Sequence, residues 1–330
     1  MTNQIRLRTL LAMLVAVAMA LGVAACGDDE DDSGGGGGGS EASADNLIEE
    51  NSDNNGVKLT VGSKNFTEQI VLGEIYAQAL EAAGYDVSTD LNLGSEVVAL
   101  KALEQGEISG YPEYTSTALT SFFDTPPEDV PSDGAEAVDQ AQADFEEKGL
   151  IAYPPTEFSS ANAVGLLTET ADELGVSTIS DLEGKSQDLD LYGSPECRQR
   201  IDCLVGLEEN YGLEFKSFTP IDIGLRYQVL DKGEADLSIL FTTDAQLFTD
   251  SDTYTVLEDD QGVLPAGNVT FVATQEAADE AGPDFGETIE KVQGDLSLEV
   301  MQELNAKVDV DKEKPEDAAR EYLQDFGYVE

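Results

Sequence analysis

The chain has 330 residues, of which 68 are acidic and 17 are basic, and its formal net charge is -51. This charge excludes a general nucleic-acid-binding protein, because phosphate groups would be repelled. The chain has no histidine, which excludes Ser-His-Asp and Cys-His catalysis and removes the most common metal ligand. The acidity indicates a solvated surface, as is common in proteins adapted to salt; a surface that attracts cations is the alternative.

The N-terminus has the pattern of an export signal. Arg6 and Arg8 precede an apolar run over residues 10–25, which ends in small residues directly before Cys26. A cysteine at this point resembles the bacterial lipobox, in which the cysteine is lipidated and becomes the first residue of the mature protein. We therefore predict a lipoprotein signal peptide over residues 1–25 and lipidation of Cys26. An ordinary signal peptide or a short membrane anchor is the alternative.

An acidic and glycine-rich segment follows Cys26. Glycine-serine chains are flexible, and an acidic block cannot bury itself. We predict a disordered tether over residues 26–56, which holds a folded body outside the cell membrane. No later stretch approaches the roughly 20 apolar residues that are needed to cross a bilayer.

Beyond the tether, short β-like runs alternate with helical runs. We predict strands at residues 59–62, 87–91, 108–111, 163–168, 190–192, 215–219, 237–241 and 269–273. We predict helices at residues 68–83, 95–105, 135–148, 200–211, 224–230, 285–295, 298–307 and 315–326, and a loop at 124–134. This alternation indicates an α/β protein with mostly parallel sheets. The roughly 270 residues of this body are enough for two domains.

Two polar segments follow predicted strands, at the sheet edge where ligands bind in open α/β sheets. Residues 63–69 place Lys64 and Asn65 before a helix, and residues 111–117 place Tyr114 beside several hydroxyl groups. A cation, aromatic rings and hydroxyl groups suit the capture of a small polar molecule better than bond-breaking chemistry. The position of Lys64 favours contact with an anion, and a surface lysine is the alternative.

An internal echo links the two halves of the body. Tyr114-Thr115 and Phe241-Thr242 fall at the same offset from Leu103 and Leu230, and in both places a glycine ends the preceding helix. The echo predicts two similar lobes that present matching walls of one cleft. Taken singly, Tyr114 and Phe241 would be core residues more often than ligand walls, and their paired placement makes the two interpretations equally good.

Two cysteines remain once Cys26 is assigned to the lipid. Cys197 and Cys203 can form a disulfide across a short loop, because an exported protein lies in an oxidising compartment. Two free thiols are the alternative. Arg200 lies inside this loop, where its fork-shaped guanidinium group could clamp a carboxylate or form a structural ion pair.

Several segments together resemble the osmoprotectant-binding proteins of ABC importers, a family that captures glycine betaine, choline, carnitine and related compounds. The segments are residues 62–69, 111–117, 224–227, 241–244 and 257–260. The resemblance extends from about residue 58 to the C-terminus. It implies a two-lobed periplasmic-binding-protein-like (type II) fold with a hinge and a ligand cleft between the lobes. The first lobe would comprise residues 57–158 and 265–330, and the second lobe residues 159–264.

The resemblance also implies site residues. Family members hold the solute's carboxylate with a lysine, a threonine and an arginine, which match Lys64, Thr117 and Arg200. A box of tyrosines holds the quaternary ammonium group; Tyr114 matches one of them. The other tyrosines fall at Asn162, Phe241 and Gly267, and a family aspartate falls at Ser160, so the box is incomplete. Either Tyr111, Tyr192 or Tyr227 supplies a replacement aromatic ring, or the natural ligand is a different carboxylated solute. The complete set of expected ligand-binding residues is Lys64, Asn65, Tyr114, Thr117, Asn162, Arg200, Phe241 and Thr242.

These expectations define one function. We expect a lipid-anchored, extracytoplasmic and monomeric solute-binding protein that delivers a small zwitterionic or quaternary ammonium solute to an ABC permease and its ATPase. It would have no cofactor, no metal site and no catalytic residues. A binding protein for a different small carboxylated solute, such as an amino acid, is the alternative because the tyrosine box is incomplete. An extracytoplasmic enzyme on the same scaffold is disfavoured by the missing histidine.

Overall fold

The computed structural model describes residues 46–330. The predicted signal peptide, the lipidation site Cys26 and most of the predicted tether lie outside the described residues. Within the described part of the chain, no helix combines the length and the apolar character needed to cross a membrane.

The order of elements follows the predicted alternation of strands and helices. The strands are β1 (Lys58–Gly62), β2 (Asp86–Asp90), β3 (Gly110–Tyr114), β4 (Leu150–Ala152), β5 (Ser159–Ser160), β6 (Asn162–Leu167), β7 (Asp190–Gly193), β8 (Ser217–Pro220), β9 (Leu237–Phe241), β10 (Tyr254–Val256) and β11 (Gly267–Thr274). The helices are α1 (Thr67–Ala82), α2 (Glu96–Glu104), α3 (Thr115–Thr117), α4 (Gly134–Glu147), α5 (Thr168–Leu174), α6 (Leu204–Glu209), α7 (Arg226–Asp231), α8 (Ala245–Thr249), α9 (Gln275–Ala281), α10 (Pro283–Gln293), α11 (Leu298–Asp309) and α12 (Pro315–Asp325).

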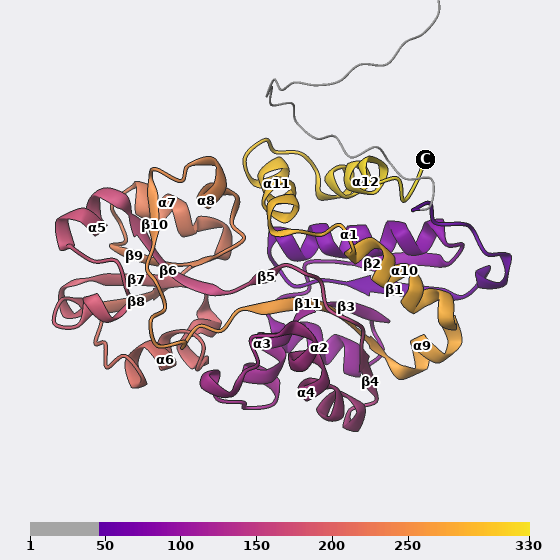
Figure 1. Cartoon of the computed structure of the whole chain (residues 1–330), viewed down its shortest axis with the longest axis horizontal. Helices are drawn as coiled ribbons and strands as arrows, with labels where there is room; N and C mark the ends of the chain where they lie inside the picture. Colours follow the sequence, from indigo (N-terminus) through magenta and orange to yellow (C-terminus); the bar gives the residue numbers. More distant parts are fainter. Residues whose placement is uncertain (1–45) are drawn as a thin grey trace, which may run out of the picture. The chain divides into compact units, whose positions relative to one another are not determined.

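The strands form two sheets (Figure 1). The first sheet has the order β2-β1-β3-β11-β4, with β5 paired to β11, and the second has the order β10-β6-β9-β7-β8. We call the first sheet with α1–α4 and α9–α12 the first lobe, and the second sheet with α5–α8 the second lobe. The prediction of mostly parallel sheets was wrong. β6 and β11 follow the two crossings between the sheets, and each runs antiparallel to its neighbours.

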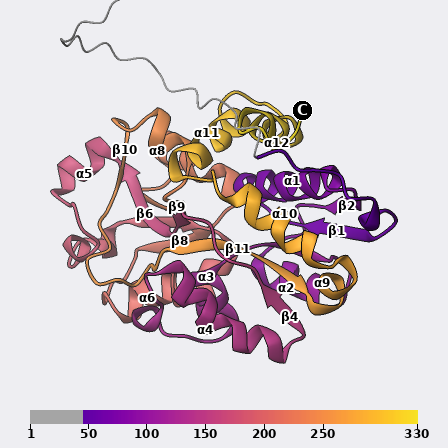
Figure 2. The ribbon, with the colours of Figure 1, turned by 45° about the vertical axis from the view of Figure 1, so that its right-hand side comes forward.

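Helices cover both faces of the first sheet, and alternating residues of β11 show why. Phe271 and Ala273 belong to the core beneath α1, α10, α11 and α12, whereas Val272 belongs to the core beneath α2 and α4. Successive side chains of a strand point to opposite faces. Figure 2 shows these two helical layers from a second direction. In the second lobe, Ile239 and Leu240 divide between two cores in the same way.

Two extended segments connect the lobes. The first runs from β5 into β6, and the second from β10 into β11. Ser160 pairs with Gly267, so β5 still belongs to the first sheet and the first crossing lies after residue 160, slightly beyond the predicted boundary. The two threonines of the sequence echo hold these crossings: the Thr242 hydroxyl accepts from the Ala161 amide, and the Thr115 hydroxyl accepts from the Asn268 amide.

The predicted helix over residues 200–211 is shorter than expected. Only Leu204–Glu209 is α-helical, and Arg200 has extended backbone. The structure places Cys197 and Cys203 in a disulfide, which closes this loop before the helix begins. Short elements without a clear periodicity, β4, β10, α5, α8 and α9, were not predicted.

The described end of the predicted tether is part of the first lobe. The Ile48 amide donates to the Tyr328 carbonyl at 3.0 Å, and the Asn51 side chain donates to Asp284 at 2.6 Å. Asn54 is buried, and its side chain donates to the Ala83 carbonyl at 2.8 Å. The expectation of disorder up to residue 56 was therefore wrong for residues 46–56, because these asparagines supply partners that composition alone does not reveal.

Helix α11 also contacts both lobes, although it lies far along the chain from the two segments that cross between them. Its residues Met301 and Leu304 pack into the first lobe, and the helix contacts α8 of the second (Figure 1). The Asn305 side chain donates to Glu68 of α1 at 2.9 Å and to the Thr243 carbonyl at 3.0 Å. The same Glu68 carboxyl group accepts from the Tyr114 hydroxyl at 2.5 Å. One buried carboxyl group thus connects Tyr114 to the second lobe.

Burial raises the pKa of Glu68 above its usual 4.5, although hydrogen bonds oppose part of the effect. The folded state therefore holds the proton at pH values where the unfolded state has lost it. This contribution to stability is complete below pH 4.5 and is lost as pH rises through the pKa of the folded state.

We predict that Glu68→Gln removes this pH dependence. Urea unfolding at a series of pH values from 4.5 to 8 should show that the wild-type free energy of unfolding falls with rising pH relative to that of the variant. Glu208→Gln, at an exposed position of α6, is the control and should follow the wild type. Parallel curves for all three proteins would contradict the prediction.

Candidate functional site

A cavity of about 80 Å³ lies between the lobes. Its first-lobe wall comes from the segment after β1, the start of α2 and the end of β3, and its second-lobe wall comes from β6, β9 and the disulfide loop. Seven of the expected site residues line it: Lys64, Asn65, Tyr114, Thr117, Asn162, Arg200 and Phe241. Thr242 is not among the lining residues, because its hydroxyl group is bound to the Ala161 amide.

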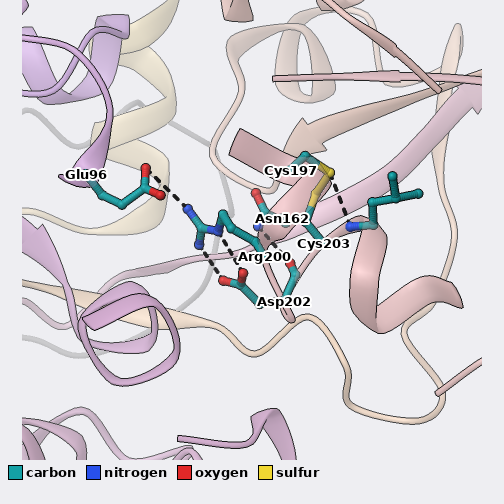
Figure 3. Close-up of a disulfide and its surroundings, with 7 residues drawn as sticks. Glu96, Asn162, Cys197, Arg200, Asp202 and Cys203 are labelled. Carbon is teal, nitrogen blue, oxygen red and sulfur yellow. Dashed lines mark hydrogen bonds and ion pairs between the residues drawn. A yellow bond between two sulfur atoms is a disulfide. The ribbon is translucent and has the colours of Figure 1, made fainter. Parts of the chain in front are cut away.

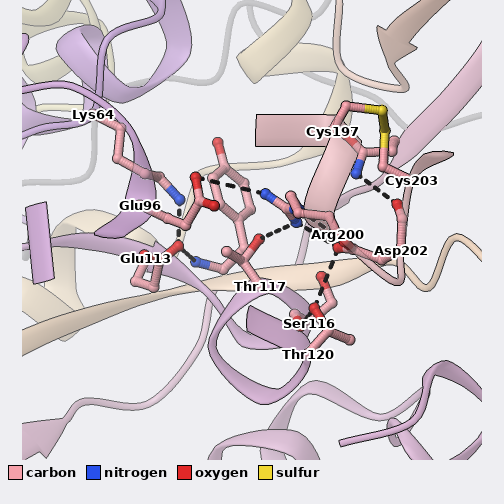
Figure 4. Close-up of polar contacts among 12 residues, drawn as sticks. Lys64, Glu96, Glu113, Ser116, Thr117, Thr120, Cys197, Arg200, Asp202 and Cys203 are labelled. Atoms are coloured by element: carbon pink, nitrogen blue, oxygen red, sulfur yellow. Dashed lines mark hydrogen bonds and ion pairs between the residues drawn. A yellow bond between two sulfur atoms is a disulfide. The ribbon is translucent and has the colours of Figure 1, made fainter. Parts of the chain in front are cut away.

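Lys64 follows the last residues of β1 and is buried. Its ammonium group forms an ion pair with Glu113 (Figure 4) and lies over the Tyr114 ring at 4.6 Å from the centroid. Glu113 is fully buried and also accepts from the Tyr111 hydroxyl at 2.9 Å. Every residue of β3 is buried, so no alternation in the sequence revealed that this glutamate faces the lysine.

Arg200 enters the cavity from the disulfide loop. Its guanidinium group forms an ion pair with Asp202, with Nε at 2.7 Å from Oδ1 (Figure 3). It then reaches the first lobe, where Nη2 lies 3.4 Å from the Thr117 hydroxyl and Nη1 lies 3.8 Å from a Glu96 oxygen (Figure 4). Asp202 is buried and fixes the direction of the fork. Arg200 therefore stands opposite Thr117 in one crevice with Lys64.

Three aromatic rings line the cavity, and the sequence reasoning missed one of them. The Phe66 ring centroid lies 6.2 Å from that of Tyr114 and 5.1 Å from that of Phe241, so it stands between the rings of the two lobes. Phe66 lies within the first polar segment beside Lys64, directly before α1. This position in the sequence could have identified it as a residue of the cavity wall. Burial, and next the nearby Glu68, raise the pKa of Tyr114, so its hydroxyl group remains a donor.

The suggested replacement aromatics do not line the cavity. Tyr111 is fully buried against Glu113. Tyr227 donates to Asp244 at 3.0 Å, and Tyr192 packs in the small core beside Tyr227. The alternative in which one of them completes the box is therefore contradicted, since their hydroxyl groups or rings are engaged elsewhere.

Asn162 and Gly267, the two positions of the expected box without an aromatic ring, have polar surroundings. Asn162 donates to the Asp202 carbonyl at 2.9 Å and so supports the loop that carries Arg200. A Cβ atom at Gly267 would lie 2.3 Å from the Ser116 hydroxyl oxygen and 2.6 Å from its amide nitrogen. The backbone therefore leaves no room for any side chain at residue 267, and Ser116 forms that part of the wall.

Arg226 is a further cavity residue that the sequence reasoning did not select. It begins α7 and forms an ion pair with Asp244 at 2.8 Å. The two lie on opposite sides of β9 in the sequence, and no local pattern joins them. The three cations that line the cavity are thus each paired with a carboxylate, an arrangement suited to holding a polar molecule in a fixed orientation.

Comparison with known proteins supports this picture. Residues 57–325 match the family described as the substrate binding domain of ABC-type glycine betaine transport systems. The chain is 31% identical over 278 residues to a glycine-betaine-binding protein of Pseudomonas aeruginosa, covering 81% of this chain and 87% of the relative. It is 28% identical to the carnitine transport binding protein OpuCC of Listeria monocytogenes, covering 82% and 88%.

A solved structure described as a glycine betaine/carnitine/choline ABC transporter has a similar fold. Its TM-score is 0.64 at 26% identity, and the match covers 81% of this chain and 97% of the solved one. The two-lobed α/β fold predicted from the sequence is confirmed. With the match over residues 57–325, the chain belongs to the family of substrate-binding domains of ABC-type glycine betaine transport systems.

Proposed function

We propose that this protein captures a small zwitterionic or quaternary ammonium osmolyte, such as glycine betaine or choline, in the cavity between its lobes and delivers it to an ABC permease. The carrying observation is that Lys64, Arg200 and three aromatic rings line one cavity between two lobes. Cations suit the acidic end of such a solute. Aromatic faces suit its quaternary ammonium end.

The carboxylate of the solute would bind Lys64, Thr117 and Arg200. These residues come from both lobes, so the bound carboxylate bridges them and favours closure. Because Glu113 and Asp202 already pair with the two cations, the solute adds bonds to groups that are held in place. Pre-ordered groups lose little freedom on binding, which favours affinity.

The cationic end would lie against Tyr114, Phe66 and Phe241. A cation over an aromatic face gains about 0.5–2 kcal/mol, with the larger value when it is desolvated. Asn162 and Ser116 replace aromatic walls with hydrogen-bonding groups, so this box is weaker toward a trimethylammonium group than one of four tyrosines.

The proposal extends to location and partners. We propose that Cys26 is lipidated, that the protein is anchored on the outer side of the cell membrane, and that it works as a monomer with a permease and its ATPase. The signal-like residues 1–25 and the flexible composition that follows support this. We assign it no catalytic role.

We predict that Cys26→Ser releases the protein from membranes. The wild-type protein should fractionate with membranes and carry the mass of a lipid on its N-terminal cysteine, whereas the variant should be soluble and lack that mass. Fractionation followed by mass spectrometry checks both. A wild-type protein that retains residues 1–25 would contradict the lipoprotein proposal.

A second candidate is a binding protein for a different small carboxylated solute, such as an amino acid. Asn162 and Ser116 favour it, because they offer hydrogen-bond acceptors that a trimethylammonium group cannot use. Calorimetry with glycine betaine, choline, carnitine, proline and amino acids separates the candidates. A folded protein that binds none of these compounds contradicts both.

We predict that Arg200→Met lowers the affinity for the best solute of this panel by about 100-fold or more, because truncating a hydrogen-bonded charge in a binding site costs about 2–5 kcal/mol. Arg198→Met is the matched control: this exposed arginine lies in the same loop and donates to the Phe218 carbonyl. Calorimetry on variants with unchanged thermal unfolding gives the comparison. Equal affinities of the Arg200 and Arg198 variants would remove Arg200 from the site.

We predict that Tyr114→Ala weakens binding of a quaternary ammonium solute about tenfold, because a desolvated cation–π contact is lost. Tyr114→Phe keeps the ring face and should retain affinity within about threefold, even though it loses the hydrogen bond to Glu68. If the alanine variant also stays within about threefold, the cationic end does not use this ring and the second candidate gains support.

A further inference from the structure

Both rings that the sequence assigned to the cation box already carry a cation of the protein. The Lys64 ammonium group lies 4.6 Å from the Tyr114 centroid, and the Arg226 guanidinium carbon lies 4.1 Å from the Phe241 centroid. Lys64 has an expected partner in the solute's carboxylate and could turn toward it. Arg226 has no such role in the proposed function.

Arg226 is held firmly in this position. Its Nε donates to the Ile223 carbonyl at 2.7 Å, and its Nη2 donates to Asp244 at 2.8 Å. The second oxygen of Asp244 accepts from the Tyr227 hydroxyl at 3.0 Å and from the Phe241 amide at 2.9 Å. Asp244 thus binds the arginine and the backbone of the stacked phenylalanine together, which fixes the guanidinium group on the ring.

The remaining nitrogen of Arg226 is unused. Nη1 is buried and has no hydrogen-bond partner among residues 46–330. Arg226 lies on the wall shared by the cavity described above and a second cavity of about 180 Å³, which Phe66, Phe241 and Asn305 also line. A buried donor without an acceptor is unfavourable, and the adjoining space is large enough for one to be supplied by a solute.

We propose that Arg226 determines specificity. It covers one face of the Phe241 ring and so weakens the contact of that ring with a quaternary ammonium group, and its free Nη1 group selects zwitterions that carry a hydrogen-bond acceptor near their cationic end. This inference rests on the proposed function, because it concerns the same cavity and the same solute class.

Two physical effects act at Arg226. An aromatic face that holds one cation cannot hold a second at the same distance, because the two charges repel. A guanidinium N–H group needs an acceptor, and a trimethylammonium group has none. Arg226 therefore disfavours a simple betaine and favours a solute with a carbonyl or hydroxyl oxygen at that end.

The test uses a double variant, Arg226→Met with Asp244→Asn. It removes one positive and one negative charge, so the net charge of the site is unchanged, and the introduced amide keeps an oxygen for the Tyr227 hydroxyl and the Phe241 amide. Arg198→Met is the matched control, since Arg198 stacks on Phe218 at 5.1 Å and is not among the cavity-lining residues. Arg226→Gln serves if the double variant does not fold.

Two probes of similar size are compared by calorimetry. Glycine betaine has a trimethylammonium group and no acceptor there, whereas glycylglycine is a zwitterion with an amide carbonyl beside its ammonium group. The double variant should bind glycine betaine at least about fivefold more tightly than the wild type and glycylglycine at least about fivefold more weakly. The Arg198 variant should match the wild type for both.

The outcomes separate the two proposals. If the wild type binds a solute but the folded Arg226 variants leave the preference between the two probes within about twofold, or weaken glycine betaine binding, the role of Arg226 is refuted and the proposed function stands. If the folded wild type binds neither probe nor any compound of the larger panel, the proposed function itself fails.

Discussion

The site depends on the compensation of buried positive charge. Lys64, Arg200 and Arg226 line one cavity, and each has its own carboxylate in Glu113, Asp202 or Asp244. An unpaired buried cation is unfavourable, because its charge has lost its hydration. Removing the carboxylate of any of these pairs would create such a cation. The carboxylates therefore belong to the site as much as the cations do, and a solute can add to these pairs without first creating them.

The fold serves this arrangement by bringing short polar segments together from distant parts of the chain. Lys64 follows β1, Arg200 lies in the disulfide loop before α6, and both reach the cavity because β6 and β11 cross between the sheets. The crossings are supported by Thr115 and Thr242 through equivalent bonds to backbone amides. The two aromatic-threonine pairs therefore have divided roles: their aromatic residues line the cavity, and their threonines support the crossings between the sheets.

Sequence reasoning found the parts of the site that local signals mark. Strand ends and equal spacing led to Lys64, Tyr114 and Phe241, and family motifs led to Arg200 and Thr117. It could not find Glu113, because all of β3 is buried and shows no alternation, or the pair of Arg226 and Asp244, which forms across β9. The parallel sheets were mispredicted for a related reason: strand direction after a crossing is a property of the whole fold.

The acidity of the chain also bears on the solute. A net charge of -51 repels anions and attracts cations over distances of about 8 Å at physiological ionic strength. A zwitterion has no net charge and is not repelled by this surface, whereas a simple anion is repelled. In the proposed site, Lys64 and Arg200 would hold the acidic end of the solute, and Arg226 would keep its basic end from one face of Phe241. The surface therefore disfavours anionic solutes, and in the proposed site the group next to the cationic end would distinguish among the others.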